Sequence, residues 1–322
     1  MKLDVMESCD YVVSRAQHVS IDVEGIAKQA ACMSPQDLLK ISSPASFDTD
    51  LHYVNRGTAA GEAQTVQYLL VVDALNFCFW PAPGLEYEHL AGGVMAALLE
   101  DPQALSATRL AAMTGADVRK LIGWSGGNVP LQDERARLLR EVGEGLLESY
   151  SGSAANLVAA AKGSAVRLGQ LVTAAFPGFR DHAVYQSRQI FLYKRAQIWV
   201  GDVFGALQGQ GLGAFGDMHE LTMFADYRVP VVLREMGILK YTLTLQQKVA
   251  AGEEIYPGSE EEVEIRAATI VAVHQLRGLL QARLPPGSPP LLSVCLDWWL
   301  WEQGEKKRTE HPLHHRTRTI YY

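Results

Sequence analysis

Cysteine is scarce in this sequence, and the few cysteines lie far apart. No two of them form a CxxC pair, and no histidine stands beside one at the spacing of zinc ligands. This pattern argues against a disulfide framework and against structural zinc, so it predicts a reduced, cytoplasmic setting. The four cysteines are Cys9, Cys32, Cys78 and Cys295.

Positive charge is also in short supply. The chain has 29 Lys and Arg against 36 Asp and Glu, and its formal net charge is −7. Proteins held to nucleic acid by bulk electrostatics normally present a basic surface, so stable binding of duplex DNA is not expected. No apolar run reaches the roughly 18 residues of a membrane span. Met1–Glu7 carries acids and lacks the apolar core of a signal peptide, so we expect no membrane association.

Hydrophobic residues are abundant, at 48% of 322 residues, which is enough to bury a large core. Clean alternating strands are almost absent, so we predict a predominantly α-helical fold organised as one compact unit over 1–322. Within it we expect a mainly helical N-terminal part, 1–175, and a second part, 176–322. Apolar residues at helical spacing predict helices over 8–40, 132–149, 154–175, 243–251 and 261–284.

Other segments carry more specific expectations. The apolar run 67–81 ends in aromatics, and its periodicity fits a buried helix or a buried strand equally well. Pro285–Pro290 predicts a linker. Glu261 and Glu262 are expected to be solvated at a helix N-terminus, where acids favour the helix dipole. The tail 314–322 ends on tyrosines, so we expect it to dock rather than to fray.

The stretch Phe191–Lys240 is read as helix, loop, helix, and it is the stretch most expected to carry chemistry. Asp226 stands inside its second apolar run, near Phe224 and Tyr227. An aspartate in such company is rarely fully buried unless something pairs with it. It can be a helix N-cap or a catalytic carboxylate, and the two roles are compatible.

Two pieces of this stretch resemble the helix-hairpin-helix DNA glycosylases. Phe191–Ile198 is similar to the "fyxxKAxxI" helix of that superfamily, and Asp226–Gly237 to its "vDthVxRvlxRlG" segment, whose aspartate is catalytic. The resemblance implies a helical glycosylase-like architecture with additional N-terminal helices, and it places Asp226 at the catalytic position. The glycine hairpin that grips DNA in that superfamily is missing between Gly216 and Met223.

A second resemblance spans nearly the whole chain, because six dispersed strings occur in one order. They are similar to strings of the queuosine salvage family, whose members are queuosine 5′-phosphate N-glycosylase/hydrolases. The resemblance implies release of queuine and ribose 5-phosphate from queuosine 5′-phosphate, without a metal or redox cofactor. The strings are Asp73–Trp80, Tyr193–Gln197, Thr222–Arg228, Glu262–Arg266, Leu296–Trp301 and Ile320–Tyr322.

Roles for particular residues follow from the resemblance and from the chemistry. Asp226 would stabilise an oxocarbenium-like sugar or orient the attacking water, and Asp297 would accept from the N–H edge of the base. Glu302 would pair with the cationic amine of queuine. The rings of Phe77, Phe224 and Trp301 would stack on the base. The remaining candidates are Lys194, Arg228 and the tail residues Arg316 and Arg318 for the 5′-phosphate, by charge alone, and Asn76 and His52 as further substrate contacts.

Less specific interpretations stay open beside these. Tryptophans on one short element are more often core than pocket, Asp297 could bond backbone amides, and Lys194 with Arg195 could be a solvated pair. A lone loop histidine such as His52 is usually solvated. For the whole chain, the alternatives are a non-catalytic queuine or nucleoside carrier and a nucleic-acid base-excision glycosylase.

Overall fold

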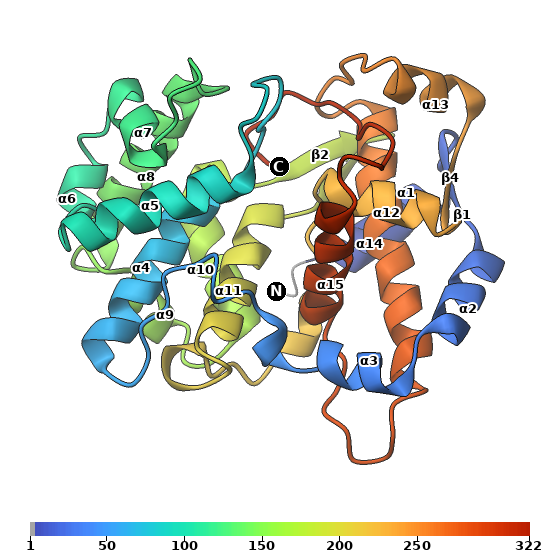
Figure 1. Ribbon diagram of the computed structural model, residues 1–322, viewed down its shortest axis with the longest axis horizontal. Coiled ribbons are helices and arrows are strands. Elements are labelled where there is room, and N and C mark those ends of the chain that lie inside the picture. The colour runs from blue at the N-terminus through green and yellow to red at the C-terminus, as the bar shows by residue number, and fades with distance from the viewer. Residues whose placement is uncertain (1–3) are drawn as a thin grey trace. The chain divides into compact units, whose positions relative to one another are not determined.

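The fold is built mainly from helices. The computed structural model describes residues 4–322, and within that range the chain forms fifteen α-helices and four short β-strands (Figure 1). The prediction of a predominantly α-helical fold is therefore confirmed. The helices are α1 Val5–Val13, α2 Val23–Cys32, α3 Pro35–Ile41, α4 Ala59–Leu75, α5 Tyr87–Glu100, α6 Ala107–Leu110, α7 Gly115–Ile122, α8 Gln132–Ser149, α9 Ala154–Ala160, α10 Ala165–Ala175, α11 Lys194–Ala206, α12 Arg228–Glu235, α13 Leu243–Ala250, α14 Glu260–Gln281 and α15 Ser293–Lys306.

Backbone contacts divide the chain into two units. The first unit combines the chain up to Ser46 with Asp181–Gln197 and His219–Arg318. The second unit combines Phe47–Arg180, Ile198–Met218 and Thr319–Tyr322. Segments that are remote in sequence therefore share a unit. The predicted organisation as one compact unit, with parts 1–175 and 176–322, stays a prediction.

Helix α14 is the centre of the first unit. Every residue from Glu262 to Val273 is buried, and α1, α2, α12 and α15 pack against this helix (Figure 1). Its charged residues must therefore find partners inside the protein. Glu262, which was expected to be solvated, is only 3% exposed and pairs with Arg266 one turn along the helix. That expectation is wrong for Glu262, because its carboxylate bonds within the protein, to Arg266 and to the Gly258 amide at 3.0 Å.

Helices α4 and α8 occupy the centre of the second unit. The ambiguous run 67–81 is helical as far as Leu75, where α4 ends. Helix α8 has the predicted bounds and packs against α4, α6 and α7. The carbonyl of Tyr322 accepts a hydrogen bond from the amide of Cys78 at 3.0 Å, and Tyr322 is 2% exposed. The prediction that the tail docks is therefore confirmed.

Two antiparallel ladders were not predicted. Strand β1, Val19–Ile21, pairs with β4, Leu239–Tyr241, and β2, His182–Tyr185, pairs with β3, Arg188–Phe191. Strands of three or four residues are too short to show a period of two in the sequence. The β2–β3 turn has positive φ at both central residues, as two-residue hairpins require.

Two other expectations also need correction. The predicted helix 154–175 is two helices, α9 and α10, because Lys162 and Gly163 adopt positive φ and Ser164 caps the second helix. The proline-rich segment Pro285–Pro290 connects α14 and α15 within the first unit, so it is a loop rather than a linker between units.

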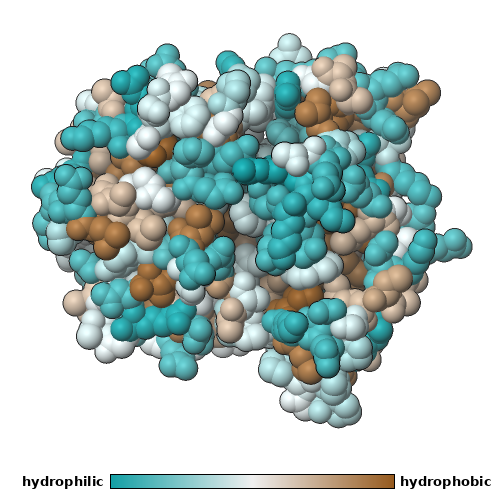
Figure 2. All heavy atoms as spheres, viewed as in Figure 1, coloured by the Kyte–Doolittle hydropathy of each residue, from teal (hydrophilic) through white to brown (hydrophobic). Residues whose placement is uncertain are grey.

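The surface is mixed in character. Figure 2 shows a largely hydrophilic face on which hydrophobic side chains occur in small, scattered groups. The large exposed apolar residues, such as Leu99, Val184 and Tyr256, come from separate elements. Among residues 4–322, none of the helices combines the length and the hydropathy that crossing a bilayer requires.

Candidate active site

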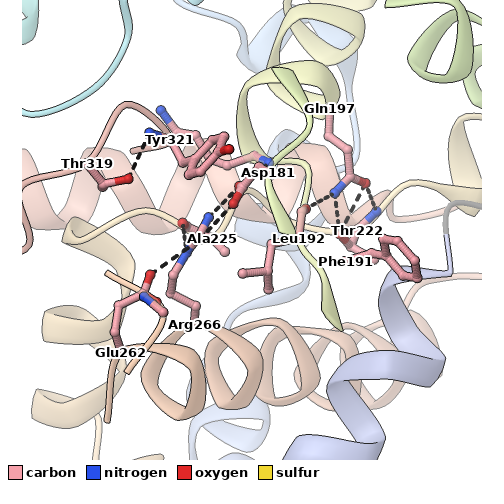
Figure 3. A network of polar contacts seen from close by, with 12 residues as sticks. Asp181, Phe191, Leu192, Gln197, Thr222, Ala225, Glu262, Arg266, Thr319 and Tyr321 are labelled. Atoms are coloured by element: carbon pink, nitrogen blue, oxygen red, sulfur yellow. Dashed lines mark hydrogen bonds and ion pairs between the residues drawn. The ribbon is translucent and has the colours of Figure 1, made fainter. Parts of the chain in front are cut away.

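The segment Leu221–Tyr227 leads into α12 but is not itself helical. The side chain of Gln197 holds its start, because Oε1 accepts from the Thr222 amide at 2.9 Å and Nε2 donates to the Leu192 carbonyl at 3.0 Å (Figure 3). Asp297 on α15 holds its middle, where Oδ1 accepts from the Phe224 amide at 3.0 Å. The amides of Thr222 and Phe224 therefore donate to side-chain oxygens, whereas amides inside a regular helix donate to backbone carbonyls.

Asp226 stands immediately before α12. Its Oδ1 accepts from the backbone amides of Arg228 and Val229, both at 3.0 Å. The predicted capping role is therefore confirmed, since amides in the first turn have no acceptor inside the helix. The side chain is half-buried, and its Oδ2 has no hydrogen-bond partner among residues 4–322. One oxygen is held by the helix, and the other is available to a ligand.

Asp297 and Lys194 influence the charge of Asp226. Burial raises the pKa of Asp226, and the positive charge of Lys194 opposes that rise. Burial, followed by the negative charge of Asp226, raises the pKa of Asp297 well above its usual range. Two carboxyl groups beside one ammonium group cannot both ionise at low cost, so the pair favours retention of a proton on Asp297.

The predicted solvated pair at the start of α11 is buried instead. Lys194 is 3% exposed and Arg195 is fully buried. Arg228, the other candidate for the phosphate, donates through Nε to Glu305 at 2.6 Å. Arg228 therefore already balances one carboxylate.

An aromatic pair lies directly after Asp226 in the chain. The ring of Tyr227 lies 4.3 Å from the ring of His314, measured between centroids. Burial lowers the pKa of His314 to about 4, so this imidazole is neutral at neutral pH. The pair therefore consists of two uncharged rings, tilted by 33° to each other, one directly after Asp226 in the chain and one from the C-terminal tail.

The predicted contacts on α15 differ in exposure. Trp301 is half-buried and keeps accessible surface, which suits contact with a ligand. Glu302 is exposed and forms an ion pair with Lys306 at 2.8 Å, as on an ordinary solvated helix face. Phe224 is only 1% exposed, so its ring offers no open face for a base. The roles proposed for these three residues stay predictions, and only Trp301 combines a ring with accessible surface.

The remaining predicted site residues, His52, Asn76 and Phe77, belong to the second unit. His52 is buried rather than solvated, and its ring nitrogens lie 2.7 Å from the Asp48 carbonyl and 2.8 Å from the Tyr87 hydroxyl. Asn76 ends α4 and is 8% exposed.

Phe77 is fully buried, and the guanidinium of Arg135 lies 4.2 Å from its ring centroid. Stacking of a base on Phe77 is therefore not what this structure provides. The roles proposed for Asn76 and His52 stay predictions.

Sequence reasoning missed the residues that hold the site in place. Gln197 and Arg266 stood inside two of the family-like strings, but neither was assigned a role. Asp181 was also passed over, although it is 1% exposed and pairs with Arg266. A buried charge inside an apolar helix was the available signal for Arg266.

Comparison with known proteins identifies the family. Residues 55–322 match the family model described as "Queuosine salvage protein". The chain belongs to this family. It is 40% identical over 322 residues to a Dictyostelium discoideum protein named queuosine 5′-phosphate N-glycosylase/hydrolase, covering 99% of this chain and 98% of that protein. Proteins of the same name from Sphaerobacter thermophilus and Mus musculus are 41% and 36% identical, and each comparison covers at least 98% of both chains.

The recognition made from the six strings is therefore confirmed for this member of the queuosine salvage family. The similarity extends over almost the whole length, so it includes both units of the structure. It also includes Asp226, Asp297 and Lys194, all of which lie within the matched residues 55–322.

Proposed function

We propose that this protein hydrolyses the N-glycosidic bond of queuosine 5′-phosphate and releases queuine and ribose 5-phosphate. The observation that carries the proposal is the placement of Asp226, with one oxygen bound to the α12 amides and the other open to a ligand. The names of the relatives support the same reaction.

Asp226 acts on the sugar in this mechanism. Cleavage of a nucleoside bond develops positive charge on the ribose, and a fixed carboxylate stabilises that charge or orients the attacking water. The two amide hydrogen bonds hold Asp226 in one orientation before substrate arrives. Its partial burial strengthens the electrostatic interaction, because less water screens it.

Asp297 acts on the base. Its Oδ1 is bound to the Phe224 amide, so Oδ2, which has no hydrogen-bond partner among residues 4–322, would face the ligand. The raised pKa keeps a proton on Asp297 in the free protein, so the group can donate a hydrogen bond. The base has no N7 to protonate, so a neighbouring acid must assist its departure in another way. The cationic amine of queuine would favour the ionised form of the same group.

The remaining interactions belong to binding. Lys194 supplies a buried cation for the 5′-phosphate, with Arg228 as a second candidate, and Trp301 supplies an accessible ring for stacking. His52 and Asn76 are retained as proposed substrate contacts. We also propose a cytoplasmic location, a glycosylase-like ancestry for the site and no stable binding of duplex DNA, in keeping with the net charge of −7.

Mass spectrometry of free base tests this proposal. The purified protein is incubated with queuosine 5′-phosphate, queuosine and guanosine 5′-phosphate. We expect queuosine 5′-phosphate to be cut fastest, because binding of the remote phosphate assists the reacting centre. Guanosine 5′-phosphate should be cut poorly, since it lacks the aminomethyl-cyclopentenediol arm. Equal rates on the two nucleotides would overturn the assignment, and binding without any release would indicate a carrier.

A further inference from the structure

Arg266 and Asp181 form a buried ion pair. Hydrogen bonds join this pair to the backbone before Asp226 and to the backbone amide of Lys194. Nη1 of Arg266 donates to one carboxylate oxygen of Asp181 at 2.9 Å, and Nη2 donates to the other at 2.6 Å (Figure 3). The side chains are 2% and 1% exposed. Such a two-point contact fixes the guanidinium in direction as well as in position.

The arginine end of the pair reaches the Asp226 backbone. Nε of Arg266 donates to the carbonyl of Ala225 at 3.0 Å, and that carbonyl belongs to the peptide that joins Ala225 to Asp226. The amide of the same peptide donates to the Phe224 carbonyl at 2.7 Å. The peptide plane is therefore held on both sides, which leaves little freedom for the residue that follows.

The aspartate end of the pair reaches Lys194. Oδ2 of Asp181 accepts from the Lys194 amide at 2.9 Å, and the Asp181 carbonyl accepts from the amides of Leu192 and Tyr193, both at 3.0 Å. Tyr193 has a φ of 51°, in the left-handed region that residues with a Cβ rarely adopt. Asp181 thus accepts three hydrogen bonds from the amides of this strained turn. These bonds determine where α11 begins.

We propose that the Arg266–Asp181 pair is the positioning element that holds the backbone at Asp226 and the backbone at Lys194 in a fixed relative position. The pair links the peptide before the carboxylate to the first amide of the helix that carries the lysine. Stability alone does not account for it, because a buried ion pair is often no more stabilising than well-packed apolar residues. The kinetic part of the test rests on the proposed function, whereas the spectroscopic part does not.

A second buried acid on the same helix provides a matched control. Glu264 accepts hydrogen bonds from the amides of Gln17, His18 and Val19 and from the Tyr185 hydroxyl, so it holds an N-terminal segment remote from Asp226. Glu264→Gln should lower thermal stability and leave turnover by the folded protein unchanged. It therefore measures what the loss of a buried polar partner does by itself.

The kinetic test compares Arg266→Lys and Asp181→Asn with wild type on queuosine 5′-phosphate. Lysine cannot reach the Ala225 carbonyl and both Asp181 oxygens at once, and asparagine keeps the shape of Asp181 without its charge. We expect kcat to fall about 10- to 100-fold in each variant with little change in KM, since misplacement by 1 Å can cost about 10²-fold. In an Asp226→Asn background, Arg266→Lys should have no further effect on the residual rate.

The spectroscopic test needs no activity. Carboxyl 13C signals of labelled aspartate are followed against pH, and Asp226 is assigned from the spectrum of Asp226→Asn. If Arg266→Lys or Asp181→Asn moves Lys194 away, the pKa of Asp226 should rise, because Lys194 lowers it in wild type. Glu264→Gln should leave the Asp226 titration where it is.

The outcomes separate the two proposals. Unchanged kcat in folded Arg266→Lys and Asp181→Asn, with an unchanged Asp226 titration, would overturn the positioning role while the proposed function stands. Multiplicative effects of Arg266→Lys and Asp226→Asn would also overturn it. If wild type releases no base, the proposed function fails, and the titration alone then decides the positioning role.

Discussion

Two buried arginines, one in each unit, perform different tasks. Arg266 in the first unit binds two carboxylates, Asp181 and Glu262, and one backbone carbonyl. Arg135 in the second unit donates to the backbone carbonyls of Leu75, Phe77, Cys78 and Pro130 and lies over the Phe77 ring. The second arginine fixes the course of the chain after α4. The first joins the Asp181 carboxylate to the peptide that precedes Asp226.

This difference between the two arginines indicates that the chemistry of the protein is expected in the first unit. Asp226 and Asp297, the two carboxyl groups of the proposed site, both lie in the first unit, and burial raises the pKa of each. Perturbed carboxyl groups close to one another are characteristic of functional sites. Of the residues predicted for the site in the second unit, Phe77 is fully buried, and His52 and Asn76 stay proposed substrate contacts. The predictions below test this division between the units.

The largest effect is expected from Asp226→Asn. Base release should fall by roughly 10²–10³-fold, because the variant loses the charge that stabilises the oxocarbenium-like sugar. The melting temperature should change little, since the asparagine oxygen can still accept from the amides of Arg228 and Val229. Turnover close to that of wild type would mean that Asp226 serves only as a helix cap.

Arg135→Lys should act on stability instead. A lysine cannot donate to several carbonyls in one plane, and those left without a donor should cost about 3 kcal/mol in the free energy of unfolding. Urea denaturation measures this loss. The kcat of the folded variant should stay near that of wild type, in contrast to Arg266→Lys. A fall in kcat as large as that of Arg266→Lys would remove the distinction between the two units.

Asp297→Asn should weaken queuine binding by about 1–3 kcal/mol. The cationic amine of queuine favours the ionised form of Asp297 in the complex, and the variant replaces its charge-assisted hydrogen bond with a neutral one. The same substitution should raise the thermal stability of the free protein at neutral pH. Since the folded pKa lies well above the ordinary 3.8, the stability that this proton contributes is present at low pH and lost as pH rises through the folded pKa.

Asparagine lacks this dependence. The melting temperature of Asp297→Asn should therefore exceed that of wild type at neutral pH, and the difference should shrink as pH falls towards 4. Isothermal titration with queuine and melting curves across this range measure both effects. A lower melting temperature with normal binding would make Asp297 a structural acid.

The smallest effect concerns one buried histidine from each unit, His52 and His314. Burial lowers the pKa of both, and that of His314 falls to about 4. The unfolded chain takes up protons below about pH 6.5, whereas the folded protein does so only at lower pH, so stability is lost as pH falls through this window. For His314, whose folded pKa is about 4, the loss should be about 1 kcal/mol at pH 5.5. For His52 the loss has the same sign.

Chemical denaturation between pH 7 and pH 5 measures that dependence. Replacement of either histidine by glutamine should reduce the slope of stability against pH. A slope equal to that of wild type in both variants would mean that neither ring is buried in its neutral form.

Much of the secondary structure could be predicted from local pattern. The bounds of α8 follow from apolar spacing. The run 67–81 did not reveal where its helix ends, because α4 stops at Leu75, six residues before Pro81. The break between α9 and α10 was missed, because alanine-rich sequence does not reveal that Lys162 will adopt positive φ. The short strands were missed because three or four residues are too few to show a period of two. The partners in β1 and β4, such as Val19 and Tyr241, also lie far apart in the chain.

The candidate site was predictable only in part. Asp226 and Asp297 were identified because acids in apolar runs must be paired, capped or functional. The sequence by itself determined the helical class, the acidic character and the family, since these depend on composition and on local motifs. Only the tertiary structure decided that Phe77 is enclosed, that Glu302 faces solvent, and that Arg266 joins Asp181 to the Ala225 carbonyl. Those facts depend on contacts between segments far apart in the chain, and no local pattern encodes such contacts.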